Sequence, residues 1–178
     1  MSIRIGTALT AIIGLLAVTQ VAAAADMRAD MNRTTQAGPG EPVGDIVVAP
    51  GAGGTVLKLN LRGLPPGPHG FHVHENGACG PTTANGNPVP AGAAGGHWDT
   101  DHTGRHEGPH GQGHNGDLPV LDVATDGTAT QSLTAPRIKD ASQLKGHALV
   151  IHAGGDNYSD QPAALGGGGG RIACGVIS

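Results

Sequence analysis

Residues 55–61 read TVLKLNL, a pattern that indicates the class of fold. Leucine recurs at every second position, with Lys58 and Asn60 between the leucines. Successive side chains of a β-strand point to opposite faces of the sheet. This spacing therefore predicts a strand with one face in a core and the other in water.

Similar short apolar runs lie on both sides of this strand, separated by turns rich in Gly and Pro. The other expected strands are 43–49, 69–74, 118–123, 129–134, 146–152 and 172–177, and 31–36 could form a first strand. The chain has 32 Gly and 13 Pro in 178 residues, and both disfavour helices. Only 2% of the residues are aromatic, so the core must be built from Val, Ile, Leu and Ala. We predict an all-β fold, an antiparallel Greek-key sandwich or barrel of about eight strands with two long functional loops.

The two long loops lie between expected strands and lack periodicity. Residues 75–117 are largely Gly, His, Pro, Asn and Asp, and residues 154–170 are rich in Gly. A structureless loop as long as the first one is unusual inside a compact domain. We therefore expect a disulfide or a metal ion to organise it.

Residues 1–25 have the pattern of a secretory signal peptide. Arg4 precedes an apolar, uncharged run over 5–18. Ala23–Ala25 then supply the small residues of a cleavage site before Asp26. A membrane anchor is the alternative, but the run is shorter than the roughly 20 residues that a span needs. We expect an exported protein, periplasmic or extracellular.

The remainder has the length of one ordinary domain. Residues 26–38 are polar and predict a flexible N-terminal arm, although a first strand could already begin within it. Residues 39–178 would then form the β domain. The formal net charge of −4 argues against a general nucleic-acid binder, which would be basic.

Cys79 and Cys174 are the only two cysteines, and neither lies in a C-x-x-C motif. Export permits a disulfide between them. Such a bridge would close a loop of about 95 residues and would stabilise the fold by about 4 to 5 kcal/mol in the chain-entropy view. Two free thiols are the alternative.

Histidine is the outlier of the composition, with ten residues, as many as Lys and Arg together. Most lie between His69 and His114, and imidazole is the commonest metal ligand among side chains. His72-Val73-His74 forms an H-x-H on an expected strand, which places both imidazoles on one face. A surface histidine pair is the alternative interpretation.

More histidines lie in the first long loop, together with a carboxylate. Three imidazoles and one carboxylate suit tetrahedral zinc, and binding would fold the loop. The candidates are His97 in GGHWD, His106 in GRHEG, and His114 and Asp117 in GHNGDL. Histidines without a role in a solvated loop are the alternative, as His102 and His110 indicate.

Three residues near the C-terminus complete the candidate site. His152 ends an expected strand, and Asp156 follows four residues later. A carboxylate beside metal-bound imidazoles commonly holds their free N–H groups. Arg171 follows five glycines and lies near Cys174, where it could supply a cation to the site. For each residue taken singly, a structural or surface role is the alternative.

Five segments together carry a family resemblance. They are GFHVHENGAC (70–79), GGHWD (95–99), GHNGDLP (113–119), VIHAGGDNYSD (150–160) and GGGGGRIACGVI (166–177). In this order they resemble copper,zinc superoxide dismutase in its exported bacterial form. The resemblance runs from about Met31 to the C-terminus, and the ordered set is far more specific than any one motif.

The resemblance implies a copper ion and a zinc ion in one joint site. It assigns copper to His72, His74, His97 and His152, and zinc to His97, His106, His114 and Asp117. His97 would bridge the two metals, and Asp156 would join the two ligand sets through their outer nitrogens. Arg171 would guide the substrate, and the family's disulfide corresponds to Cys79 and Cys174.

The implied activity is dismutation of superoxide to oxygen and hydrogen peroxide, with copper alternating between Cu(II) and Cu(I) and zinc in a structural role. His97 would release copper on reduction and carry a proton for the leaving peroxide, so His97 and Arg171 are the candidate catalytic residues. Superoxide, a small anion, is the expected partner. We expect no nucleic-acid partner and no membrane span in the mature form, and the sequence leaves the oligomeric state open, a homodimer included.

Two positions depart from the family pattern. His110 could compete with His114 for the third zinc position, but His114 keeps the H-x-G-D unit of the family. The last loop, 154–170, has none of the lysines that the family often places there. The charges that steer the substrate, apart from Arg171, are therefore open.

Two other functions would use the same residues. One is a module that stores or passes copper or zinc, and the other is a catalytically dead sandwich that keeps only zinc. All four expected copper positions are histidine, which favours the enzyme. The sequence leaves open the roles of His69, His102, His110, His147 and Trp98, with a structural or exposed position expected for His147.

Overall fold

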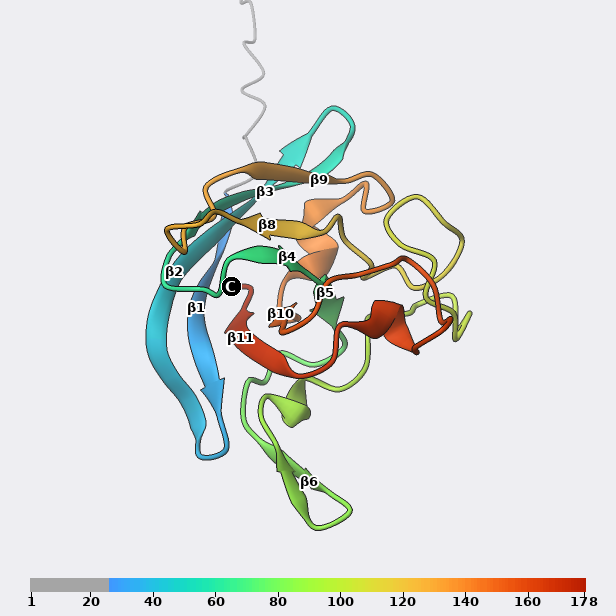
Figure 1. Cartoon of the computed structure of the whole chain (residues 1–178). Coiled ribbons are helices and arrows are strands. Elements are labelled where there is room, and N and C mark those ends of the chain that lie inside the picture. Colours follow the sequence, from blue (N-terminus) through green and yellow to red (C-terminus); the bar gives the residue numbers. More distant parts are fainter. Residues whose placement is uncertain (1–25) are drawn as a thin grey trace, which may run out of the picture.

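A computed structural model describes residues 26–178 (Figure 1). The expected signal peptide, residues 1–25, lies outside the described residues. The strands are β1 (Met27–Thr35), β2 (Gly38–Gly51), β3 (Gly54–Leu61), β4 (Gly67–His69), β5 (Phe71–His74), β6 (Thr82–Ala84), β7 (Asn87–Val89), β8 (Leu121–Val123), β9 (Ser132–Ala135), β10 (Ala148–His152) and β11 (Arg171–Val176). Short 3-10 helices lie at η1 (Gly92–Ala94), η2 (Ala141–Leu144) and η3 (Leu165–Gly167). Within the described residues, no helix has the length and apolar character needed to cross a membrane.

Seven strands form one antiparallel sheet in the order β5-β10-β11-β1-β2-β3-β9, which curls into a half-barrel (Figure 1). β11 returns from the end of the chain to lie beside β1, next to the meander β1-β2-β3, an order of the Greek-key type. β5 and β9 are the two edge strands of this sheet. β4, which leads into β5, pairs with β8, which leads to β9, so this separate two-stranded pair joins the chain segments next to the two edges. The predicted antiparallel all-β fold is confirmed. The strand count is higher than expected because the short strands β6 and β7 lie in the first long loop and because the expected strand 69–74 is divided at Gly70 between β4 and β5.

The core lies behind the strands that carry the candidate site. The three leucines of β3 are buried, whereas Lys58 and Asn60 are exposed, as the alternation predicts. These leucines belong to the main hydrophobic core, which also includes Val73 from the H-x-H motif. Burial of one such side chain stabilises the fold by about 1.5–3 kcal/mol. The core therefore fixes β5, and with it the side chains on the opposite face of that strand.

The N-terminal segment corrects one expectation. Residues 26–38 do not form a flexible arm, because β1 occupies 27–35 and lies inside the sheet, between β11 and β2. Ala29 and Met31 of this strand are fully buried, and Asp30 between them is exposed. Two alternating apolar side chains are too short a pattern to predict a buried strand from the sequence. They suffice for a strand in the structure because β11 and β2, on its two sides, supply main-chain hydrogen bonds.

The first long loop is ordered by a hairpin and a disulfide. β6 and β7 pair through Asn85-Gly86, whose positive φ angles of 50° and 78° suit the tight turn that Asn-Gly favours. This hairpin was not predicted because its strands lack apolar alternation. The expected disulfide is confirmed, since Cys79 in this loop is bonded to Cys174 on β11.

Candidate metal centre

The H-x-H motif lies on β5, at one edge of the curled sheet. His72 and His74 are 0% and 1% exposed, and Val73 between them packs into the hydrophobic core. The two imidazoles therefore share the face opposite to the core, as the strand periodicity predicts. β10 pairs with β5 on its inner side, and His152 ends that neighbouring strand.

The first long loop docks on the outer edge of β5 through its main chain. Trp98 N–H donates to the Val73 carbonyl at 2.9 Å, and Val73 N–H donates to the Gly116 carbonyl at 2.9 Å. His97 pairs as an isolated bridge with one histidine of the motif, and Asp117 pairs with the other. Main-chain pairing thus carries residues that are far along the sequence to the side of the H-x-H motif.

Four buried imidazoles form the first donor set. It consists of His72, His74, His97 and His152, whose potential ligand atoms all lie within 4.8 Å of one another. The Nε2 atoms of His74 and His152 are 3.4 Å apart. Their Nδ1 atoms contact the main-chain oxygens of Gly95 and Gly169 at 3.0 and 3.1 Å. Donation from Nδ1 leaves the Nε2 lone pairs free for a metal ion.

The second donor set surrounds the carboxylate of Asp117. Its Oδ1 lies 3.1 Å from Nδ1 of His97, 3.0 Å from Nδ1 of His106 and 3.4 Å from Nδ1 of His114. The four residues expected for zinc are therefore brought together around one oxygen atom. The group whose ligand atoms lie within 4.8 Å of one another comprises His72, His97, His106 and Asp117, so His114 is the outermost of the expected residues.

The two donor sets present buried nitrogen atoms that lack partners. Among the described residues, these atoms are Nδ1 of His72, Nε2 of His97, Nδ1 of His106 and Nδ1 of His114; the last two lie close to Oδ1 of Asp117 but without hydrogen-bond geometry. An unpaired polar atom in a protein interior costs about 1–3 kcal/mol. Metal ions would satisfy all four atoms. His97 belongs to both groups, and its Nδ1 lies beside Asp117 while its Nε2 has no partner, so this one imidazole can join two ions.

Asp156 connects the two sets from behind. One carboxylate oxygen lies 2.8 Å from Nε2 of His72, and the other lies 2.7 Å from Nε2 of His106. The Asp156 side chain is fully buried. When both imidazoles donate their Nε2 protons to this carboxylate, their Nδ1 lone pairs point toward the donor sets. The structure thus brings Asp156 to the outer nitrogens, as the resemblance implies.

Burial keeps the first donor set uncharged. It lowers the pKa of His72 to about 3 and the pKa of His152 to about 4. It also lowers the pKa of His74 and of His97. These imidazoles are therefore neutral at physiological pH, the form in which a ring nitrogen can bind a metal ion.

His106 behaves differently because two carboxylates face it. Burial lowers its pKa, but the carboxylates of Asp117 and Asp156 outweigh burial and raise it to about 9. The three imidazoles around Asp117 likewise outweigh burial there and hold the pKa of that carboxyl well below its usual range. The second set is thus built to hold positive charge, which suits a divalent cation.

Arg171 begins β11 and reaches toward the first donor set. Its guanidinium donates to the carbonyls of Ala91 and Gly95, both at 2.6 Å. Nδ1 of His74 contacts the same Gly95 oxygen, so one carbonyl links the arginine to a donor imidazole. Burial lowers the pKa of Arg171, but a guanidinium stays charged at neutral pH. The site therefore has a fixed cation beside it.

The remaining histidines of the first long loop lie outside both donor sets. His102 and His110 are exposed. His114, by contrast, is buried beside Asp117. The geometry favours His114 over His110 for the second donor set, in agreement with the H-x-G-D argument.

The other residues left open by the sequence have structural contacts. Both ring nitrogens of His69 contact main-chain oxygens, one of them the oxygen of His152 at 2.7 Å. The ring of His147 lies 5.3 Å from the half-buried ring of Trp98, which packs against the hydrophobic core. These three side chains pack and form hydrogen bonds beside the donor sets and are not members of them.

Three residues near the donor sets were not singled out from the sequence. Asp160 accepts a hydrogen bond from the main-chain N–H of His106 at 2.9 Å. Arg137 donates to the carbonyl of His114 at 2.9 Å. Gly166 packs so closely on Asp156 that a Cβ there would lie 2.0 Å from its Oδ1. No sequence pattern marks these residues. The side chains of Asp160 and Arg137 bind the main chain of a donor residue, and Gly166 matters because it has no side chain.

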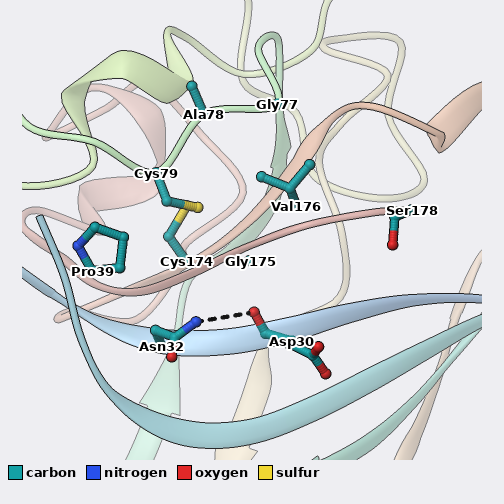
Figure 2. Close-up of a pocket in the computed structure, with 10 residues that line it drawn as sticks. All are labelled: Asp30, Asn32, Pro39, Gly77, Ala78, Cys79, Cys174, Gly175, Val176 and Ser178. Carbon is teal, nitrogen blue, oxygen red and sulfur yellow. Dashed lines mark hydrogen bonds between the residues drawn. A yellow bond between two sulfur atoms is a disulfide. The ribbon is translucent and has the colours of Figure 1, made fainter.

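A hollow of about 370 Å³ lies elsewhere, beside the disulfide (Figure 2). Its walls include Asp30, Asn32 and the Cys79–Cys174 bridge. Asn32 Nδ2 donates to the main-chain oxygen of Asp30 at 3.4 Å along one wall. None of the donor residues line this hollow, so the candidate chemistry does not take place in it.

Fold and site together define a class of protein: an antiparallel β protein with two adjoining, overlapping sets of buried metal donors. Comparison with known proteins agrees. Residues 43–177 match the copper/zinc superoxide dismutase (SODC) family. The chain belongs to this family.

Relatives match along most of the chain. The superoxide dismutase [Cu-Zn] 2 of Salmonella typhimurium is 54% identical over 156 residues, which are 88% of this chain and 90% of the relative. The superoxide dismutase [Cu-Zn] of Escherichia coli K12 is 48% identical over 167 residues, or 94% and 96% of the two chains.

Solved structures have the same fold. The Cu/Zn superoxide dismutase from Brucella abortus matches with a TM-score of 0.85 and 47% identity, covering 86% of this chain and all of that one. The monomeric copper, zinc superoxide dismutase from Salmonella enterica matches with a TM-score of 0.78 and 54% identity, over 86% of this chain and all of that one.

Proposed function

We propose that this chain is a superoxide dismutase that holds copper in the first donor set and zinc in the second. One observation carries the proposal. Buried imidazole nitrogens without hydrogen-bond partners converge in both sets, and His97 offers one nitrogen to each. A site of this kind is costly without metal ions and has little use apart from them.

The donor types match the two metals. We assign copper to His72, His74, His97 and His152, and zinc to His97, His106, His114 and Asp117. A purely imidazole set suits a metal that changes oxidation state, whereas three imidazoles with one carboxylate suit zinc. The chemistry supplied when copper is bound is one-electron transfer, by which one superoxide is oxidised to oxygen and the next, with two protons, is reduced to hydrogen peroxide. Zinc supplies positive charge and structural order.

Arg171 attracts and orients the substrate in this proposal. Its guanidinium is held by two carbonyls, so its direction is set before superoxide arrives. A fixed cation at the entrance of a site raises the local concentration of a small anion. The shared Gly95 carbonyl holds Arg171 and His74 in a constant relationship.

His97 handles a proton in this proposal. Its Nδ1 lies beside Asp117, and its Nε2 has no hydrogen-bond partner. When Nε2 is not serving as a ligand it can hold a proton, while Nδ1 stays beside Asp117 in the second set. That proton lies next to the first donor set, where the reduced substrate needs one.

The proposed function is tested by superoxide consumption with defined metal content. The purified chain is loaded with copper and zinc, with copper alone or with zinc alone, and its rate is measured by pulse radiolysis. We expect fast consumption only where copper is present, with about one copper and one zinc per chain in the fully loaded form. Both metals bound without turnover would contradict the enzyme and support a metal store.

We also propose that residues 1–25 direct export and are removed, leaving a mature chain in the periplasm or outside the cell. The disulfide between Cys79 and Cys174 supports an oxidising compartment. The mass of the exported product tests this: an N-terminus at Asp26 is expected, and an intact N-terminus would contradict it. Sedimentation of the same product tests a homodimer, which a mass of one chain would contradict.

A further inference from the structure

The last loop, 154–170, contacts His106 at two separate points. Asp156 meets the ring of His106, with its Oδ1 2.7 Å from Nε2. Four residues later, Asp160 meets the main chain of the same residue, with its Oδ2 2.9 Å from the His106 nitrogen. Two carboxylates of one loop thus hold one histidine, and only the first of them was expected from the sequence.

Asp160 also fixes its own loop. Its other oxygen, Oδ1, accepts a hydrogen bond from the N–H of Leu165 at 3.0 Å. The main chain closes the same turn, because Gly166 N–H donates to the Ser159 carbonyl at 3.0 Å. Each oxygen of Asp160 therefore has one donor, and the two donors belong to different loops. Without the carboxylate, the main chain of His106 would lose its link to the loop that carries Asp156.

We propose that Asp160 is a positioning residue for the zinc-side donor His106: it holds the main chain of His106 while Asp156 holds the ring. Two points of attachment fix both the place and the rotation of the imidazole, whereas one point fixes only its rotation. This inference rests on the proposed function, because it takes His106 to be a zinc ligand.

The same loop extends the effect toward the first donor set. Past the turn held by Asp160, the carbonyl of Gly169 lies 3.1 Å from Nδ1 of His152. A Cβ at Gly168 would lie 3.2 Å from the side chain of His152, so this part of the loop packs directly on that histidine. Asp160 therefore lies between the contacts that the loop makes with the two donor sets.

The test is the substitution Asp160→Asn in the protein loaded with copper and zinc. Asparagine keeps the size of the side chain but replaces one acceptor oxygen with an NH2 group, which cannot accept from an N–H. The rate of zinc release to a chelator is measured, together with the visible spectrum after cobalt replaces zinc. We expect release at least 10-fold faster and an altered cobalt spectrum, because residues that orient metal ligands typically change metal affinity about 10- to 100-fold.

Asp140→Asn is the matched control. Asp140 also accepts from a main-chain N–H and a hydroxyl, both of Ser142, but its contacts lie at η2. We expect this variant to release zinc at the wild-type rate. If Asp160→Asn also releases zinc at the wild-type rate with an unchanged cobalt spectrum, the proposal is wrong, even where its melting temperature falls.

A second measurement covers the case in which Asp160→Asn does not fold. Amide hydrogen exchange in the wild-type holoprotein then decides: slow exchange at His106 and Leu165 supports the proposal, and fast exchange at His106 overturns it. Superoxide consumption is measured on the same wild-type sample. Its absence would refute the proposed function, whereas exchange at His106 would still judge the role of Asp160.

Discussion

The carboxylate of Asp156 lies 2.7 Å from Nε2 of His106, and this contact spans 50 residues of sequence. The second oxygen of the same carboxylate lies 2.8 Å from Nε2 of His72. One buried acid therefore sets the ring orientation of one imidazole in each donor set. Any change that displaces Asp156 should therefore affect both donor sets at once.

Gly166→Ala should displace Asp156 and weaken zinc binding. A Cβ at this position would lie 2.0 Å from Oδ1 of Asp156 and 2.8 Å from Nε2 of His106, so the carboxylate must move. We expect zinc affinity to fall by about 10- to 100-fold, as for other losses of a group that orients metal ligands. Competition with a zinc chelator measures the change.

Gly167→Ala is the control for backbone strain. Gly166 and Gly167 have φ angles of +71° and +75°, so alanine strains both positions by about 1–2 kcal/mol. At Gly167, however, a Cβ would meet only the Ala163 methyl at 3.7 Å. Equal zinc affinities of the two variants would show that backbone strain, and not Asp156, controls the second set.

Arg171→Ala should slow superoxide consumption while copper stays bound. The variant removes the fixed cation but none of the donor imidazoles, and electrostatic attraction of this kind raises association rates by about 10-fold or more. We expect a lower rate with a flatter dependence on ionic strength. Arg171→Lys, which keeps the charge, should retain most of the salt dependence. An unchanged rate for Arg171→Ala at low salt would exclude the role.

The metal-free protein should lose stability below pH 6.5. The unfolded chain gains protons on histidine near pH 6.5, whereas folded His72 and His152 stay neutral down to about pH 3 and about pH 4. The free energy of unfolding therefore falls as the pH falls, by about 2 kcal/mol per imidazole between pH 6.5 and 5. Urea unfolding of the metal-free protein across this range measures the slope.

His106 should make the free energy of unfolding of the metal-free protein fall at alkaline pH as well. Its pKa is raised to about 9 in the folded protein, so its contribution is complete below pH 6.5 and is lost as the pH rises through 9. Stability should therefore be greatest near pH 7. His152→Gln should flatten the acid side alone. Stability that does not vary from pH 5 to 9 would contradict these assignments.

Loss of the disulfide should destabilise the fold strongly. Cys79 and Cys174 are 95 residues apart, and a loop of this size corresponds to about 4 to 5 kcal/mol of chain entropy. The double variant Cys79→Ser with Cys174→Ser should show this loss in urea unfolding. Reduction of the wild type with dithiothreitol should give the same loss, and a difference below about 1 kcal/mol would refute the estimate.

Much of the fold could be predicted from local patterns. The alternation in residues 55–61 gave the buried leucines of β3, and H-x-H on a strand gave two imidazoles on one face. Strand β1 could not be predicted over its full length, because its burial depends on Ala29 and Met31 alone and its β11 partner lies at the other end of the chain. The β6–β7 hairpin had only Asn85-Gly86 as a local signal.

The candidate site, like the fold, has residues that local sequence patterns predict and residues that they do not. The residue types of the second set indicated zinc, but membership of His97 in both sets and the role of His152 came from the family resemblance. Asp160 and Gly166 could not be recognised, since contacts with His106 some 50 to 60 residues away leave no periodic trace. Such contacts are set by how loops dock on the sheet.

The central claim is that two metal ions occupy adjoining donor sets joined by His97. Anomalous diffraction at the copper and zinc absorption edges, from crystals of the loaded protein, tests it most directly. We expect copper among His72, His74, His97 and His152, and zinc beside Asp117, with His97 touching both ions. A single ion between the sets, or a His97 ring that binds only one ion, would contradict the account.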